Sequence, residues 1–200
     1  NETKTLKQFR DAVIGEISEA VSRLFPDLTL ETLGNPLEDG TFHFTKGTAT
    51  GFSYKNLSGG EKAAFDLLLD MIVKRRKFDD TVFGIDEPES HMNTRLQGAL
   101  LGELYDLVPA GSQLWVSTHS IGMLRKAREL HKLHPDQVIF LDFEGHDYDQ
   151  HVVMSIVAPT RAFWERVLRV ALDDLSDLVA PSEIVLCEGN PKGPIPGENE

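Results

Sequence analysis

The sequence predicts an α/β fold, because short apolar strands alternate with longer segments of helical period. Residues 82–85 are short and uniformly apolar, as a buried parallel strand is, and 113–117 form a second predicted strand. Between them, 94–107 place leucines three and four positions apart, which is the period of a helix. A length of 200 residues suits one sizeable α/β domain or part of a larger one.

The composition disfavours several classes of protein. A formal net charge of −12 and a pI of about 5.0 disfavour broad nucleic-acid binding by this segment alone, since phosphate contacts need lysine and arginine. The single cysteine, Cys187, forms no disulfide framework and suits the reducing cytosol, so we expect a cytoplasmic protein. The longest apolar run, FDLLLDMIV, is interrupted by Asp66 and Asp70 and is too short to cross a membrane.

The N-terminal part predicts a helix followed by strands. Residues 4–25 carry apolar side chains at three- and four-residue steps, and the pattern favours a surface helix over a coiled coil because it is short. Pro26 ends this helix, and 28–33 and 41–47 are predicted strands. His43 alternates with two phenylalanines in the second strand, so we interpret it as a solvent-facing residue rather than a ligand.

The pentapeptide LSGGE stands directly before a long apolar segment, and it consists of Leu57, Ser58, Gly59, Gly60 and Glu61. The serine and the glycines should open a helix, where free backbone N–H groups and the positive end of the helix dipole favour an anion. An ordinary serine cap with a Gly-Gly turn is the alternative interpretation of this motif by itself.

Residues 61–76 are predicted to form the helix that this motif opens. They are apolar nearly all round, so we expect the helix to be largely buried. It ends in four consecutive cations at 74–77, where positive charge complements the helix dipole. A small basic patch for DNA is the alternative interpretation of these cations.

Charged side chains stand where the two predicted parallel strands end. Asp86 and Glu87 follow 82–85, and His119 follows 113–117. The carboxyl ends of strands are where α/β sheets bind their ligands. Two adjacent carboxylates can supply one ligand for a metal ion and one base for a nucleophile. An acidic turn on a solvated surface is the alternative.

LSGGE, the acidic pair and the histidine, in this order and spacing, resemble the C-terminal half of an ABC-type ATPase head. The resemblance implies that Asp86 holds Mg²⁺ through water, that Glu87 orients and deprotonates the attacking water, and that His119 contacts the γ-phosphate of ATP. It also implies that the LSGGE residues cap the γ-phosphate of ATP held by a partner. Two protomers would then sandwich ATP in a homodimer or a higher homo-oligomer.

No G-x-x-x-x-G-K-[ST] motif occurs, so the phosphate-cradling P-loop and its lysine are absent from the sequence. ABC-type heads carry this loop at the start of the domain, and we therefore expect the chain to be an internal or C-terminal piece of a longer protein. The alternative is a complete protein that has lost ATPase activity, which the intact Asp86, Glu87 and His119 disfavour.

Pro88, Glu89 and His91 follow the acidic pair as P-E-x-H, where transporter heads continue with a Pro-Thr-Ser-Ala-Leu-Asp pattern. This version resembles soluble ABC-type ATPases of the overcoming-lysogenisation-defect (OLD) family and their anti-phage relatives. The resemblance implies an ATPase that controls a nucleic-acid-directed effector in anti-phage defence, with a nucleic acid and an effector or trigger protein as further partners and no membrane. The alternatives are a chromosome-structure or DNA-repair ATPase whose head gates a DNA-holding arm and, less favoured, a transporter subunit.

The later part of the head predicts one basic helix and a hairpin. Residues 120–133 form the helix, 137–143 and 151–157 the paired strands, and 159–178 contain a helix that could connect two domains. The polar residues in and beside the hairpin turn match no metal-site spacing, so we interpret them as a loop: His146, Asp147, Asp149 and His151.

The segment EIVLCEGN, after Pro181, predicts an apolar strand that ends at Glu188. Such a strand resembles the first strand of a Toprim domain, which OLD-type ATPases frequently carry after the head. The resemblance implies an ATPase head over 1–180 and the start of a Toprim-like effector domain over 181–200, with Glu188 as a catalytic residue. It rests on family context, since any strand ending in Glu-Gly fits.

Overall fold

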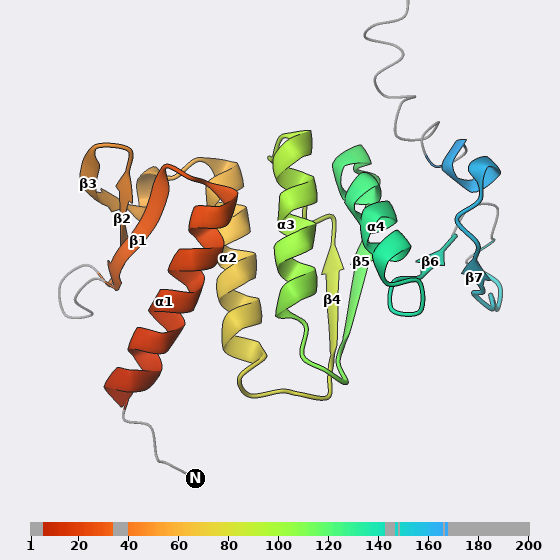
Figure 1. The fold of residues 1–200 in the computed structure, drawn as a ribbon, viewed down its shortest axis with the longest axis horizontal. Coiled ribbons are helices and arrows are strands. Elements are labelled where there is room, and N and C mark those ends of the chain that lie inside the picture. The colour runs from red at the N-terminus through yellow and green to blue at the C-terminus, as the bar shows by residue number, and fades with distance from the viewer. Residues whose placement is uncertain (1–5, 34–39, 143–146, 148, 166, 168–200) are drawn as a thin grey trace, which may run out of the picture.

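The computed structural model describes residues 6–33, 40–142, 147, 149–165 and 167 (Figure 1). Its elements are, in order, α1 (Leu6–Leu24), β1 (Leu28–Leu33), β2 (Phe42–Lys46), β3 (Ala49–Ser53), a 3₁₀ turn (Tyr54–Asn56), α2 (Gly59–Lys74), β4 (Val82–Asp86), α3 (Thr94–Leu107), β5 (Gln113–Ser117), α4 (Ile121–Leu133), β6 (Phe140–Leu141) and β7 (Ile156–Val157). The predicted α/β class is confirmed. The predicted domain at 181–200, with Cys187 and Glu188, lies outside the described residues.

The described strands form three small sheets. β1, β2 and β3 make an antiparallel sheet in chain order, β4 and β5 pair in parallel, and β6 and β7 pair antiparallel. The chain crosses from β4 to β5 through α3, the kind of connection that parallel strands require. Figure 1 shows α1 to α4 in a row, with the β1–β3 sheet at one end and β6 and β7 at the other.

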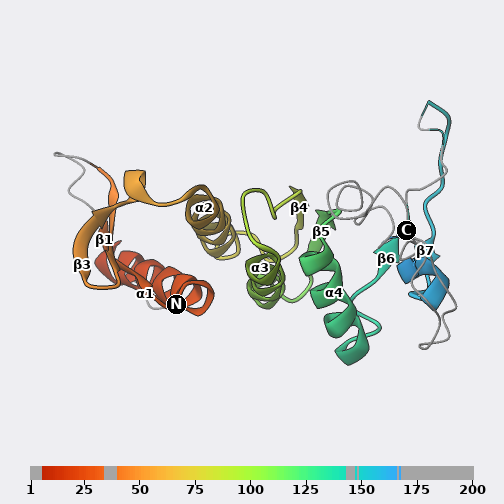
Figure 2. The same cartoon turned by 90° about the horizontal axis from the view of Figure 1, so that it is seen from above.

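Within the described residues, helices cover one face of the parallel pair. Seen from above, α3 and α4 both lie on the same side of β4 and β5 (Figure 2). On the opposite face, Val82 is 60% exposed and Trp115 is 52% exposed. The sequence predicted that 82–85 is a buried strand, and this is wrong for one of its two faces among the described residues.

The main core lies between α1, α2, α3 and the first sheet. Phe65 of α2 occupies its centre and packs edge-on against Phe42 and Phe44 of β2, with ring centroids 4.8 and 5.3 Å away. Burying one such side chain contributes roughly 1.5–3 kcal/mol. The largest fully buried side chains include those of Phe44, Phe65, Ile17, Leu28, Leu68, Ile72, Leu100, Leu104, Met123 and Val21.

A second, smaller core joins α4 to the last described segment. It consists of Leu124, Phe140, Phe163 and Trp164. Residues 161–165 are helical, and the Thr160 hydroxyl caps them by accepting a hydrogen bond from the Phe163 N–H at 3.3 Å. The predicted helix over 159–178 is therefore present as far as the structure describes it.

Among the described residues, three of the four cations at 74–77 are paired with acidic residues. Arg75 and Arg76 both form ion pairs with Glu16 of α1, the latter at 2.5 Å, and Lys74 pairs with Asp70 at 2.7 Å. Burial, with the neighbouring charge of Arg76, lowers the pKa of Arg75. Two of these cations thus hold α2 against α1, which removes the support for interpreting them as a patch for DNA.

Three predicted features differ from the structure. Residues 49–53 form β3, which the sequence did not predict because its side chains lack a buried apolar alternation. The predicted strands 137–143 and 151–157 do pair antiparallel, but only through the two-residue β6 and β7, since a turn after α4 occupies 134–138. His43 is half-buried instead of facing solvent.

None of the described helices is long and apolar enough to span a lipid bilayer.

A close approach of α3 and α4 yields a prediction for stability. A Cβ on Gly122 would collide with the carbonyl oxygen of Thr94, whereas a Cβ on Gly15 in α1 would meet nothing within 4 Å. We expect Gly122→Ala to lower the free energy of unfolding by about 1–3 kcal/mol and the control Gly15→Ala to raise it by about 0.5–1 kcal/mol. Urea unfolding measures both changes, and shifts of the same sign would contradict the packing.

Candidate functional site

Asp86 and Glu87 lie at the carboxyl end of β4, directly beside the end of β5. The parallel register pairs Asp86 with Ser117, and the Ser117 hydroxyl donates a hydrogen bond to the Asp86 carboxylate. The N–H of Glu87 donates to the Ser117 carbonyl oxygen at 3.0 Å. The pairing of these two strands therefore fixes the backbone of the acidic pair.

Glu87 has a backbone φ of 43°, in the left-handed region that non-glycine residues seldom adopt. Such a conformation costs on the order of 1–3 kcal/mol and persists only where the surroundings impose it. The hydrogen bond from its N–H to Ser117 is one such restraint. The turn aims the Glu87 side chain out of the strand direction and toward the loop that follows β5.

His119 meets Glu87 at that loop. Its Nδ1 lies 3.0 Å from Oε1 of Glu87, and the two side chains are 60% and 53% exposed. An ion pair this open to water contributes about 0–1 kcal/mol to stability. The contact therefore does little for the fold, and it leaves a carboxylate and an imidazole together where a ligand can reach both.

LSGGE begins α2 as predicted, with Ser58 as the N-cap and Gly59 as the first helical residue. The Ser58 hydroxyl accepts a hydrogen bond from the Glu61 N–H at 3.3 Å, and the Ser58 N–H donates to Glu61 Oε2 at 2.8 Å. This reciprocal arrangement is a capping box. Ser58 and Gly59 are exposed, whereas Leu57, Gly60 and Glu61 are buried, so the exposed first turn is the part that can face an anion.

Glu61 is 6% exposed and pairs with Lys46 of β2, whose Nζ lies 2.7 Å from its Oε1. Burial acts to raise the pKa of Glu61, but the hydrogen bonds from Lys46 and Ser58 outweigh it and lower that pKa. Lys46 thus supports the start of α2 from a neighbouring sheet. No pattern in the sequence indicates this role, because Lys46 is one lysine at the end of a strand.

The start of α2 also touches the loop that follows the acidic pair. A Cβ on Gly60 would lie 2.8 Å from the carbonyl oxygen of His91, a residue that itself has a φ of 64°. Contacts this short essentially never occur, so position 60 requires glycine. Among the described residues, no hydrogen bond or ion pair joins LSGGE to Asp86, Glu87 or His119.

The donor set suits a magnesium ion held at Asp86. Mg²⁺ is commonly bound through one or two carboxylates with water and substrate phosphates completing its shell, and Asp86 is an exposed carboxylate at a strand end. No group of three or more His, Cys, Asp or Glu residues in the described part of the chain could hold a metal ion. Asp147 and Asp149 form a local turn, in which the Asp149 N–H donates to the Asp147 carboxylate at 3.0 Å.

The parallel strand pair, the acidic strand end and the helix opened by LSGGE are the features from which the sequence predicted an ATPase head. Residues 5–125 match the protein family described as "AAA domain, putative AbiEii toxin, Type IV TA system". The match covers more than half of the chain, and the chain belongs to this AAA-domain family. No curated protein matches the chain.

The fold is similar to the heads of SMC ATPases in solved structures. One of these structures is described as "Structural biochemistry of ATP-driven dimerization and DNA stimulated activation of SMC ATPases". It has a TM-score of 0.57 and 18% sequence identity to this chain, and the match covers 82% of this chain and 92% of that one. An SmcHead bound to the C-winged helix domain of ScpA has a TM-score of 0.52 and 14% identity, over 78% and 45%. A Smc head with a coiled coil and joint from Pyrococcus yayanosii has a TM-score of 0.54 and 18% identity, over 85% and 30%.

The chain thus spans less than half of the last two structures, and at these identities the likeness concerns the fold. It confirms the predicted ATPase-head architecture. The predicted roles of the site residues, the OLD assignment and the Toprim domain are not tested by these matches and stay predictions.

The buried ion pair at LSGGE predicts a pH-dependent stability. A carboxyl group whose pKa is lowered by folding stabilises the protein above its unfolded-state pKa, near 4.3, and this contribution is lost as the pH falls through the folded-state pKa. We expect Glu61→Gln to lower the free energy of unfolding by about 1–3 kcal/mol at pH 7. The deficit should shrink below about pH 4, as measured by urea unfolding across pH. The exposed control Glu129→Gln should show no comparable deficit at either pH.

Proposed function

We propose that this chain provides the hydrolytic half of an ATP-binding site in a dimeric ATPase head. The observation that carries the proposal is the convergence of Asp86, Glu87 and His119 at the ends of β4 and β5, with Glu87 and His119 3.0 Å apart. Membership of an AAA-domain family and the SMC-head fold support it.

Each side chain then has one task. Glu87, exposed and aimed at His119, orients a water molecule and accepts its proton as the water attacks the γ-phosphate. His119 donates a hydrogen bond to a γ-phosphate oxygen. Asp86 holds Mg²⁺ through water, and the ion, when bound, neutralises charge that develops on the phosphates.

The groups that would hold the β- and γ-phosphates come from elsewhere, since the sequence contains no P-loop motif. The exposed first turn of α2 is suited to the γ-phosphate of ATP bound by a second protomer, because Ser58 and Gly59 lie exposed at the positive end of the helix. Among the described residues, no hydrogen bond or ion pair joins this turn to Asp86, Glu87 or His119. This supports the proposal that the turn and those three residues act on two different ATP molecules. ATP would then join two protomers face to face.

The finer assignment is an OLD-type ATPase of anti-phage defence in the cytoplasm. Its support is the P-E-x-H sequence after the acidic pair and the segment ending in Glu188, which the sequence predicts to be a strand. In this proposal the head controls a nucleic-acid-directed effector, whose Toprim-like domain begins within 181–200.

Replacing the base tests the proposed chemistry. In a head reconstituted with its P-loop segment, Glu87→Gln should slow ATP turnover by about 10²–10⁴-fold, because an amide accepts no proton from water. ATP binding should remain, since Glu87 does not hold the phosphates. Phosphate release and nucleotide binding by fluorescence measure the two. The control Glu129→Gln, an exposed substitution on α4, should leave both unchanged, and near-normal turnover in Glu87→Gln would assign the base to another residue.

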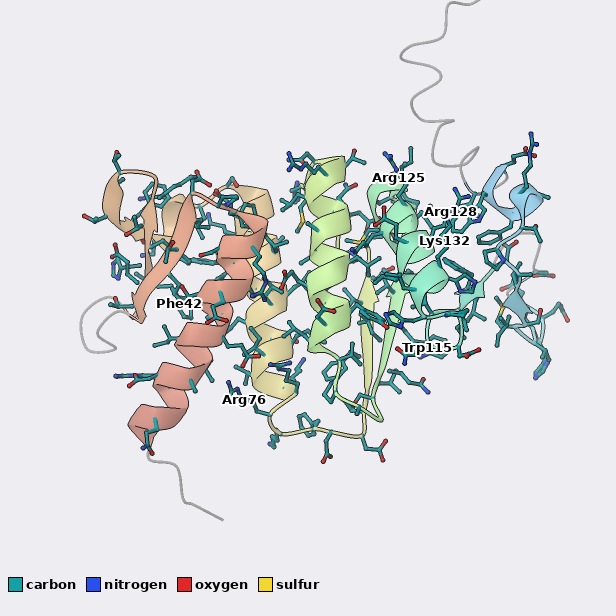
Figure 3. The ribbon with its side chains drawn as sticks, viewed as in Figure 1. Phe42, Arg76, Trp115, Arg125, Arg128 and Lys132 are labelled. Carbon is teal, nitrogen blue, oxygen red and sulfur yellow. The ribbon has the colours of Figure 1, made fainter. Side chains whose placement is uncertain are left out.

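A chromosome-structure or DNA-repair ATPase is the second candidate function. The SMC-head fold favours it, and so does a basic stripe on α4. The stripe consists of Arg125, Arg128 and Lys132, which are exposed along α4 (Figure 3). Their spacing of three and four residues places them on one face of the helix, and the Arg128 guanidinium lies 5.5 Å from the centroid of the Trp164 ring.

Salt-dependent DNA binding discriminates this second function. If the stripe contacts phosphates, replacing Arg125, Arg128 and Lys132 with glutamine should weaken DNA binding and reduce the slope of log K against log salt by roughly 0.9 per lost contact. A control with glutamine at Arg10, Arg95 and Arg161, exposed on other elements, removes the same charge. Equal losses in both variants would indicate a general charge effect and count against the stripe.

A further inference from the structure

Glu89 is a buried carboxylate in the loop that follows the acidic pair. It is 6% exposed and buried together with Pro88, although Glu87 before them and Ser90 after them are exposed. A carboxylate in such a place is retained only where hydrogen bonds replace its lost water. Its partners therefore indicate what it does.

One oxygen of Glu89 holds the loop that carries His119. Oε1 accepts a hydrogen bond from the Thr118 hydroxyl and another from the Ser120 N–H at 3.2 Å. These two donors flank His119 in the sequence. A single carboxylate thus attaches the His119 loop on both sides to the loop that begins at Glu87.

Gln97 of α3 braces the same two loops. Its Nε2 donates to the Met92 carbonyl oxygen at 2.9 Å, and its Oε1 accepts from the Ser120 hydroxyl at 2.6 Å. Glu87 and His91, on either side of Glu89, both have positive φ values of 43° and 64°. The backbone around Glu89 therefore holds an uncommon conformation that these bonds help to impose.

Packing cannot set the distance between Glu87 and His119, because both side chains are more than half exposed. Their separation of 3.0 Å depends instead on how the two loops are joined. Besides the backbone hydrogen bond from Glu87 to Ser117 and the bridge made by Gln97, the buried Glu89 side chain joins them directly on both sides of His119.

We infer that Glu89 is a positioning residue of the hydrolytic site, which holds Thr118–Ser120 so that His119 stays in reach of Glu87 and of the same phosphate. This inference rests on the proposed function. In the proposed reaction, Glu89 does not touch the reacting atoms. Its second oxygen, Oε2, is buried and has no hydrogen-bond partner among the described residues, so an amide at that position loses no bond seen in the structure.

Turnover in the reconstituted head tests the inference through matched variants. Glu89→Ala should lower kcat by about 10–100-fold, the usual cost of misplacing a reacting group by about 1 Å or of losing an outer support, with KM for ATP changed by less than about threefold. Glu89→Gln keeps the acceptor oxygen and should retain most of the rate. Equal losses of kcat in the two variants would overturn the inference, because the acceptor oxygen would then not be the feature that matters.

A double mutant separates positioning from plain stability. If Glu89 acts through His119, adding Glu89→Ala to His119→Ala should cost less than about threefold more in kcat, whereas independent effects multiply. Glu103 provides a control, since its carboxylate pairs with Arg23 at 2.7 Å and its side chain is 13% exposed. Glu103→Ala should lower thermal stability with kcat unchanged, and a loss of kcat equal to that of Glu89→Ala would assign both effects to stability.

Hydrogen exchange on this chain decides the contact without any ATPase assay. Glu89→Ala should speed exchange of the Ser120 amide, and Glu89→Gln should leave it protected, because the amide oxygen still accepts that N–H. The Ser120 N–H also donates to the Thr118 hydroxyl oxygen at 3.0 Å, so the comparison is repeated in a Thr118→Val background. Unchanged protection of Ser120 on adding Glu89→Ala there would overturn the inference whatever the turnover shows. Failure of the proposed function itself would appear differently, as turnover that is indifferent to Glu87→Gln.

Discussion

The parallel register of β4 and β5 is the constraint on which the candidate site depends. It sets Asp86, the last residue of β4, opposite Ser117, the last residue of β5. Glu87 and His119 follow these strand ends within two positions. Because strand side chains alternate between faces, a slip of one residue would turn Asp86 away and misalign Glu87 with the loop of His119. The packing of α3 against α4, which needs glycine at position 122, covers one face of this pair and so stabilises the register from behind.

The elements with strong local patterns could be predicted closely. α3 and β5 have the predicted bounds, 94–107 and 113–117, because each carries a clear period between turn or capping residues. The contacts that organise the site could not be predicted, since they join distant segments. Thr118 and Glu89 are 29 positions apart, and no periodicity links a strand-end lysine such as Lys46 to the capping box at Glu61.

The exposed face of β4 and β5 has the same physical origin as the wrong prediction of a fully buried strand. An apolar run predicts burial on both faces only when helices cover both sides of the sheet, and in the described residues α3 and α4 cover one side. Val82 and Trp115 therefore remain exposed on the other. In the proposed function the site is also one-sided. This chain presents the groups that act on a phosphate, whereas the P-loop motif that would hold the phosphate does not occur in the sequence.

The acidic residues of LSGGE and of the segment Asp86–Glu89 differ in burial, and their proposed roles differ accordingly. Asp86 and Glu87 are exposed, so they can exchange water for a ligand at little cost in desolvation. Glu61 and Glu89 are 6% exposed, and such carboxylates are tolerated only where nearby donors replace their water. Those donors are Lys46 and the Ser58 N–H for one, and Thr118 and the Ser120 N–H for the other. Each buried glutamate therefore fixes the backbone beside a residue with a proposed chemical role. The sequence does not distinguish these four acidic residues from one another. In the structure, Asp86 and Glu87 are accessible to a ligand, whereas Glu61 and Glu89 are buried and hold the neighbouring backbone.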